Sequence, residues 1–215
     1  MNHTFPNPTF PDPHIIGVDL SHWDNSADWP LVAASGVGFA ILKATDGGGG
    51  VDPRFAGWWA ASKAAGLPRG AYHFLEPMTG GSAQASHFFS VYTPEEGDIR
   101  PTLDIETFGG TPQSFDAIVS SAIAAVKAKT GFYPFIYSYI PFFLEHLAHN
   151  PDVRKCPDWL AEYQVAEPRG GLRPAIWQYT ETGLVRGIGK QGVDMNVFYG
   201  DKAALALHRL PAQEN

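Results

Sequence analysis

Residues 99–139 read IRPTLDIETFGGTPQSFDAIVSSAIAAVKAKTGFYPFIYSY, and this stretch decides the fold class. Its first nine residues (99–107) are predominantly apolar or β-branched, which predicts a strand. Residues 111–130 carry apolar side chains at helical spacing and stop before Gly131, so a long helix is predicted there. Residues 132–139 predict the next strand. A strand, a helix and a second strand in this order indicate a right-handed βαβ unit with parallel strands.

The same alternation continues on both sides of this unit. Further strands are predicted at 15–21, 39–45, 69–75, 159–164, 175–180 and 193–198, and further helices at 27–35, 53–66, 82–92 and 141–149. Eight strands with only five helices predict an α/β (β/α)5β3 barrel, smaller than the roughly 250 residues of a full eightfold barrel. We expect residues 1–14 to be an irregular lead and residues 15–210 to form a single barrel domain, with no second domain and no wall-binding repeats.

Composition excludes several classes of function. The formal net charge is −7, and no run of Lys or Arg is present, so a nucleic-acid partner is not expected. No apolar stretch is long enough for membrane insertion. Cys156 is the only cysteine, which excludes an intramolecular disulfide and indicates a plain thiol. Residues 1–13 lack the basic and apolar regions of a signal peptide.

Polar residues collect where the predicted strands end. In a (β/α) barrel, working residues lie at the carboxyl ends of the strands. The residues at these positions are Asp19, Lys43, Tyr72, His73, Asp104, Glu106, Tyr137, Glu162, Tyr163, Trp177, Gln178, Asp194 and Asn196. This clustering predicts a site at one mouth of the barrel.

Asp104 and Glu106 stand at the centre of this group. Side chains alternate along a strand, so both carboxyls share one face, about 6.6 Å apart along the backbone, while Leu103 and Ile105 share the other. Two carboxyls held so close disfavour double ionisation, and the pKa of one of them should rise. A glycosidase needs this asymmetry, because one carboxyl must donate a proton while the other stays ionised.

The remaining motifs do not favour metal-dependent, phosphate-binding or serine-hydrolase chemistry. His73 suits a buried core position as well as a site, and the run Gly47–Gly50, which lacks the Lys-Ser/Thr of a phosphate loop, predicts a mobile rim loop. No HExxH or other metal-ligand cluster is present, and no GxSxG elbow of a serine hydrolase. We therefore expect neither a metal nor another cofactor.

Taken together, the motifs resemble glycoside hydrolase family 25, the muramidases of the N,O-diacetylmuramidase type. The resemblance runs from about residue 16 to residue 198. The matching segments are GVDLSHW (17–23), FAILKATDG (39–47), DPRFAGWWAASKAAGL (52–67), GAYHF (70–74), PTLDIE (101–106), FIYS (135–138), WLAEY (159–163) and WQYTETGLVRGIGKQGVDMNVF (177–198). Each segment alone is weak, whereas their order and spacing together are specific.

The resemblance implies a (β/α)5β3 barrel and hydrolysis of the β-1,4 bond between N-acetylmuramic acid and N-acetylglucosamine in peptidoglycan. It implies Glu106 as proton donor, Asp104 as its partner at the anomeric centre, and Asp19 and Asp194 as flanking acids. The rest of the expected substrate-binding set is Tyr72, Tyr137, Trp177, Lys43, Glu162 and Asn196. Asp24, Asp46 and Trp58 depart from the family's usual residues, which puts rim contacts and substrate preference in question.

The role of Asp104 stays open between a nucleophile, a base in an inverting reaction and a group that polarises the substrate's own acetamido group. We favour the last, with net retention. A chitinase-like barrel, a non-catalytic lectin and a metal-dependent deacetylase are the competing interpretations. We expect a monomer that is extracellular or delivered to the bacterial cell wall, as a phage enzyme, a secreted effector or a trimmed secreted form.

Overall fold

The computed structural model describes residues 7–189 and 192–212, so residues 1–6 of the predicted lead lie outside the described part of the chain. The strands are β1 His14–Leu20, β2 Phe39–Asp46, β3 Gly50–Val51, β4 Arg69–Phe74, β5 Thr102–Asp104, β6 Phe135–Tyr139, β7 Asp158–Ala161, β8 Ile176–Gly183 and β9 Val193–Tyr199. The α-helices are α1 Trp29–Ala34, α2 Phe55–Ala64, α3 Gly81–Val91, α4 Pro112–Thr130, α5 Ile140–Phe142 and α6 Lys202–Ala206. Helix α5 continues as a π-helical turn, Phe143–Leu147.

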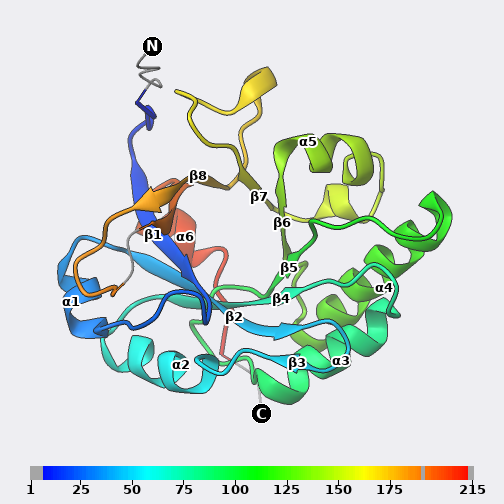
Figure 1. Ribbon diagram of the computed structural model, residues 1–215, viewed down its shortest axis with the longest axis horizontal. Coiled ribbons are helices and arrows are strands. Elements are labelled where there is room, and N and C mark those ends of the chain that lie inside the picture. Colours follow the sequence, from blue (N-terminus) through cyan, green and yellow to red (C-terminus); the bar gives the residue numbers. More distant parts are fainter. Residues whose placement is uncertain (1–6, 190–191, 213–215) are drawn as a thin grey trace.

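The sheet closes into an eight-stranded barrel. The strands follow the order β1-β9-β8-β7-β6-β5-β4-β2, and β1 also pairs with β2, which completes the ring. Helices α1 to α4 lie outside the strands (Figure 1). The predicted (β/α)5β3 barrel is therefore confirmed.

The structure corrects one feature and adds two. The sequence predicted a parallel sheet, but β9 runs antiparallel to both of its neighbours, β1 and β8. The glycine run predicted as a mobile loop forms the turn of a short hairpin, in which β3 pairs antiparallel with β2. Helix α6 follows β9 and was not expected. Asp201 caps it by accepting a hydrogen bond from the backbone N–H of Ala204 at 2.8 Å.

Helix α4 shows how the sequence sets these elements. Thr111 and Ser114 form a reciprocal capping box at its start, and Gly131 ends it in the left-handed conformation with φ 78°. Its apolar stripe is buried against Leu103 and Ile105, both fully buried beneath the helices. This burial leaves Asp104 and Glu106 to the opposite face, as the alternation predicted.

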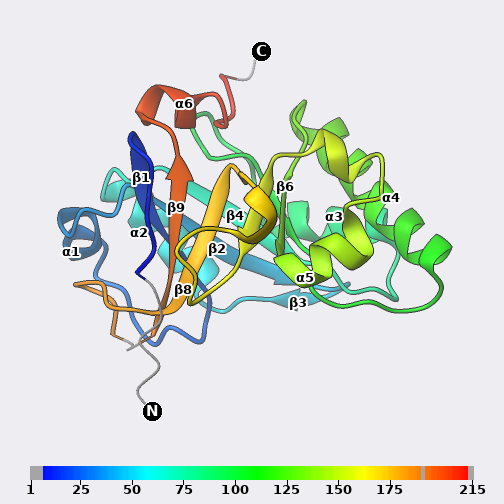
Figure 2. The ribbon, with the colours of Figure 1, turned by 90° about the horizontal axis from the view of Figure 1, so that it is seen from above.

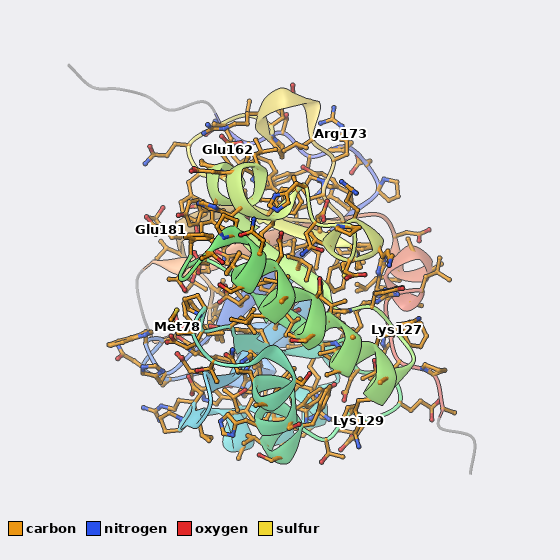
Figure 3. All side chains as sticks on the ribbon, turned by 90° about the vertical axis from the view of Figure 1, so that its right-hand side faces the viewer. Met78, Lys127, Lys129, Glu162, Arg173 and Glu181 are labelled. Atoms are coloured by element: carbon orange, nitrogen blue, oxygen red, sulfur yellow. The ribbon has the colours of Figure 1, made fainter. Side chains whose placement is uncertain are left out.

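The two ends of the barrel differ. Helix α6 lies at one end and the β2–β3 hairpin at the other (Figure 2). Met78, which follows β4, and Glu181, near the end of β8, lie on the same side of the molecule, opposite Lys127 and Lys129 of α4 (Figure 3). The carboxyl ends of the parallel strands thus form one rim. Among the described residues, no helix has the length and apolar character needed to cross a bilayer.

Candidate active site

The site is built from side chains that point into the barrel. Lower in the barrel these positions are apolar and form one buried cluster, which includes Phe39, Ile41, Phe135, Trp159 and Phe198. Nearer the rim the same inward-facing positions carry polar groups. Because side chains alternate along a strand, residues i and i+2 share the inward face, so an apolar residue deep in the barrel can be followed on the same face by a polar residue near the rim. At the floor a side chain on Gly17 would overlap the Phe39 ring at 2.3 Å, so glycine is required there.

A pocket of about 280 Å³ opens at this mouth. Its lining residues are Asp19, Tyr72, Asp104, Glu106, Tyr137, Trp159, Tyr163, Gln178, Glu181 and Asp194. Six of the predicted site residues are therefore brought together: both acids of the Asp-x-Glu pair, both flanking acids and the two tyrosines.

The backbone between the two central acids is held on both sides. The carbonyl of Asp104 accepts a hydrogen bond from the N–H of Leu75 at 2.8 Å, and the N–H of Ile105 donates to the carbonyl of Tyr137 at 2.9 Å. The Ser138 hydroxyl also donates to the carbonyl of Ile105 at 2.7 Å. Glu106 comes two residues after the end of β5, yet these bonds fix it relative to both neighbouring strands.

The carboxyls of Asp104 and Glu106 are joined by a hydrogen bond. Burial raises the pKa of Asp104 well above its ordinary value, and the charge of Glu106 raises it further. Burial also raises the pKa of Glu106, while the hydrogen bond from Asp104 and the charge of Lys43 lower it. The two carboxyls are therefore harder to ionise together than either would be alone, and the pKa of Asp104 is raised more strongly than that of Glu106. Asp104 is only 7% exposed, and its Oδ1 has no hydrogen-bond partner in the described part of the chain.

Asp19 lies across the pocket in a network of amide donors. Gln178 Nε2 and Asn196 Nδ2 both donate to Asp19 Oδ2, at 2.8 and 2.7 Å. Asn196 is itself held by the indole N–H of Trp159 at 2.7 Å. Burial raises the pKa of Asp19 well above its ordinary value, and the charge of Asp194 raises it further, whereas the two amide hydrogen bonds lower it.

Asp194 reaches this rim because β9 is antiparallel. It stands directly opposite Asp19 in the β1–β9 register, near the start of β9. The sequence placed it on the last predicted strand, 193–198, as the second residue, and the amino end of a parallel strand would lie at the other end of the barrel. The reversed direction of β9 is what brings Asp194 to the site.

The two tyrosines, Tyr72 of β4 and Tyr137 of β6, line the pocket on either side of β5. The Tyr137 hydroxyl donates to Gln178 Oε1 at 2.7 Å, and Tyr163 donates to the same oxygen. Burial raises the pKa of both Tyr72 and Tyr137 well above the ordinary value, and nearby carboxylates raise it further. Both phenols therefore stay protonated and keep their hydrogens for donation.

Comparison with known proteins matches this arrangement to a family. The family model of glycosyl hydrolases family 25 matches residues 18–188. The chain belongs to this family. It is 36% identical over 193 residues to YegX of Escherichia coli, covering 86% of this chain and 70% of that protein. It is 32% identical over 206 residues to Lysozyme M1 of Streptomyces globisporus, covering 89% and 70%. The structure of a bacterial lysozyme from Streptomyces coelicolor superposes with a TM-score of 0.84 at 31% identity, covering 93% of this chain and 98% of that one.

Four residues expected in the family 25 substrate site do not line the pocket at the barrel mouth: Trp177, Glu162, Asn196 and Lys43, of which Lys43 lines a second pocket. Trp177 is fully buried, and its indole N–H donates to the carbonyl of Glu162 at 2.9 Å. Its ring packs against Phe10 and Tyr179, outside the barrel. The expectation that Trp177 forms a sugar platform is therefore wrong, because a side chain without exposed surface cannot stack on a ligand.

Glu162 is the second correction. Its side chain is 5% exposed and pairs with Arg169, which contacts it through both the backbone N–H and the guanidinium. Both carboxylate oxygens are thereby occupied, so Glu162 anchors the loop after β7 rather than lining the pocket. Asn196 is also fully buried, and it acts on the site through Asp19.

Four pocket residues were missing from the predicted family 25 site: Trp159, Tyr163, Gln178 and Glu181. The sequence did place Tyr163 and Gln178 at strand ends, but it assigned the site to the residue before each. Counting the alternation from Ile176 could have identified the right residue. Ile176 and Gln178 share the inward face, and Trp177 between them points outward.

The remaining candidates resolve as structural. His73 is fully buried, bonded to Thr45 at 2.7 Å and to Gln84 at 3.2 Å, and burial lowers its pKa to about 4. It is a core histidine. Trp58, one of the departures from the family 25 pattern, packs edge-on against Trp29 in the core. Within residues 7–189 and 192–212, no group of three or more side chains could hold a metal ion.

Proposed function

We propose that the protein is a muramidase that hydrolyses the β-1,4 bond between N-acetylmuramic acid and N-acetylglucosamine in peptidoglycan. The observation that carries the proposal is the hydrogen-bonded pair Asp104 and Glu106 at the mouth of a family 25 barrel. Glu106 is the proton donor to the leaving sugar oxygen. Asp19 and Asp194 line the same pocket and place carboxyl oxygens around the positive charge that develops at the anomeric carbon.

The direct contact between the two carboxyls bears on stereochemistry. A hydrogen bond brings their oxygens to about 2.5–3.0 Å, whereas inverting enzymes separate the carboxyls by about 6.5–9.5 Å to admit a water. A direct contact is nearer to the roughly 5–5.5 Å separation of retaining enzymes, and on this ground we propose retention. Two roles of Asp104 are compatible with retention: a nucleophile, and a group that activates the substrate's own acetamido group.

The unpartnered Asp104 Oδ1 favours the second role. A buried acceptor without a donor is costly, and the N–H of a 2-acetamido group supplies the donor. When that N–H binds, the ionised form of Asp104 is stabilised, and the proton of the hydrogen bond between the two carboxyls moves to Glu106. Glu106 then protonates the glycosidic oxygen as the C1–O bond breaks, and the acetamido carbonyl oxygen attacks C1. Water, deprotonated by Glu106, opens the resulting oxazolinium ion with net retention.

The substrate also sets where the enzyme works. Peptidoglycan lies outside the bacterial plasma membrane, so the protein acts at the cell wall, as a monomer whose site is complete within one chain. It uses neither metal nor cofactor, and it has no nucleic-acid partner, in keeping with its net charge of −7.

Digestion of purified peptidoglycan followed by mass spectrometry tests the proposal. Fragments with muramic acid at the reducing end are expected. Fragments with glucosamine at the reducing end would instead identify a glucosaminidase. Chitin, which lacks muramic acid, serves as the control and should not be cleaved; comparable cleavage of chitin would favour the chitinase-like alternative.

A further inference from the structure

A second pocket of about 750 Å³ lies beside the catalytic one. The end of β1, the β2–β3 hairpin and the loop after β4 line it, with residues including His22, Lys43, the run Gly47–Gly50, Asp52 and Glu76. The β2–β4 register shows that the pockets are neighbours, because Lys43, which lines the second, is paired with Tyr72, which lines the catalytic one. The charge of Lys43 lowers the pKa of both Asp104 and Glu106, and the charge of Asp52 raises the pKa of Tyr72.

The glycine run keeps this second pocket open. Gly47 has φ 54°, a backbone conformation that favours glycine, and a side chain there would collide with Glu76 at 2.7 Å. A Cβ at Gly49 would meet no atom within 4 Å, so this part of the loop faces open space. Gly49 lines the second pocket and has room for a larger side chain, which would add bulk to the pocket lining.

His22 presents a fixed polar edge to the second pocket. Its Nδ1 lies 2.8 Å from Asp52 Oδ2, and its backbone N–H donates to the same oxygen at 2.8 Å. The Asp52 side chain is 1% exposed, and its other oxygen accepts from the N–H of Arg54 at 2.9 Å. Because a carboxylate only accepts, Nδ1 of His22 is the donor to Asp52, which leaves Nε2 as the ring nitrogen available to a hydroxyl.

Trp23 extends this edge as an exposed aromatic surface. It is 71% exposed, whereas Trp29, Trp159 and Trp177 are buried. The Trp23 ring lies 4.5 Å from the His22 ring, centroid to centroid. An exposed tryptophan offers a large apolar face at low conformational cost, and the C–H face of a pyranose ring is a suitable partner for it.

We infer that Trp23 and His22 form a second sugar subsite, in which Trp23 stacks on an N-acetylhexosamine ring and His22 Nε2 hydrogen-bonds to one of its hydroxyls. Asp52 is the positioning residue. The catalytic pocket, at about 280 Å³, is slightly smaller than the roughly 300–1,000 Å³ of ordinary ligand pockets, so it encloses only a short part of a glycan strand. A glycan strand held there must continue over the rim, and the second pocket is the adjoining open volume. This inference rests on the proposed function, since it takes the glycan strand as the ligand.

Kinetics on peptidoglycan oligosaccharides of increasing length, from tetrasaccharide to octasaccharide, test the subsite. For the wild-type enzyme kcat/KM should rise with length. Trp23→Ala should raise KM for the octasaccharide about tenfold, the order expected for loss of one aromatic contact, and leave kcat unchanged. Trp23→Phe should restore most of the affinity. Gly49→Leu, which adds bulk to the pocket lining, should act like Trp23→Ala. Leu207→Ala, at a side chain 75% exposed beyond helix α6, is the control.

The outcomes separate the two proposals. If the wild-type enzyme cleaves the oligosaccharides and both Trp23→Ala and Gly49→Leu show the wild-type KM at every length, the subsite is refuted. The muramidase assignment is then unaffected. A fall in kcat/KM that is the same for every oligosaccharide length also contradicts the subsite, because a remote subsite contributes only to the longer substrates. A wild-type enzyme that cleaves none of these oligosaccharides refutes the proposed function, and the inference with it.

Discussion

Replacing Trp177 by alanine tests whether this residue stabilises the fold or binds the ligand. The side chain is fully buried and contacts Phe10 and Tyr179, and its N–H is bonded to the carbonyl of Glu162. Truncating a buried tryptophan costs about 3–5 kcal/mol of unfolding free energy. For a chain of this size each kcal/mol lowers Tm by about 2–4 °C, so a drop of about 6–20 °C is expected.

Thermal unfolding followed by circular dichroism measures this drop, and KM on peptidoglycan is measured at a temperature where the variant stays folded. Trp177→Phe is the matched control: it keeps a ring but loses the N–H donor, and should cost about 1–3 kcal/mol because the Glu162 carbonyl is left without a partner. KM should stay at the wild-type value in both variants. A Tm within about 2 °C of wild type together with a raised KM would refute the structural assignment and restore the sugar platform.

Three further predictions concern the pair, metals and helix α2. Asp104→Asn should lower kcat severely and move the alkaline limb of the residual activity to lower pH. Burial and the repulsion between the two carboxylates both raise the pH at which the pair loses its last proton, and the substitution removes the repulsion. An unchanged alkaline limb in the pH profile would contradict this. Activity should survive excess EDTA, and a loss restored by zinc would revive the deacetylase alternative. Gly57→Ala, at an exposed position of α2 where a Cβ meets no atom within 4 Å, should stabilise the fold by about 0.5–1 kcal/mol in urea unfolding, and a lower midpoint would count against it.

The sequence predicted the βα units well because each combines a local pattern with a local stop signal. In α4 the capping box, the apolar stripe and Gly131 all lie within the helix or next to it. The direction of β9 has no such local signature. An apolar strand looks the same in either direction, and only its pairing with β1 and β8 makes it antiparallel.

The errors in the predicted site have one common cause. Just after β7 and near the start of β8 the sequence offered two adjacent residues, Glu162 with Tyr163 and Trp177 with Gln178, and residue type favoured the acid and the indole. A shift of one residue moves a side chain to the other face of the sheet. The pocket takes Tyr163 and Gln178, while the rejected partners support the barrel from outside. Asp104 and Glu106 were assigned correctly because the apolar residues Leu103 and Ile105 show which face of the strand is buried against the helices.

Turnover of Glu106→Gln on intact bacterial cell walls tests the central claim most directly. Glutamine keeps the shape of the side chain but cannot deliver a proton, and general acid catalysis is worth about 10²–10⁴-fold. Glu145→Gln, whose side chain is 74% exposed and lies outside the pocket, is the matched control and should retain wild-type activity. We expect Glu106→Gln to lose at least about 10²-fold in kcat while keeping the wild-type Tm and wall binding. Near-normal turnover of Glu106→Gln would contradict the assignment of the proton donor and the account of the site built on it.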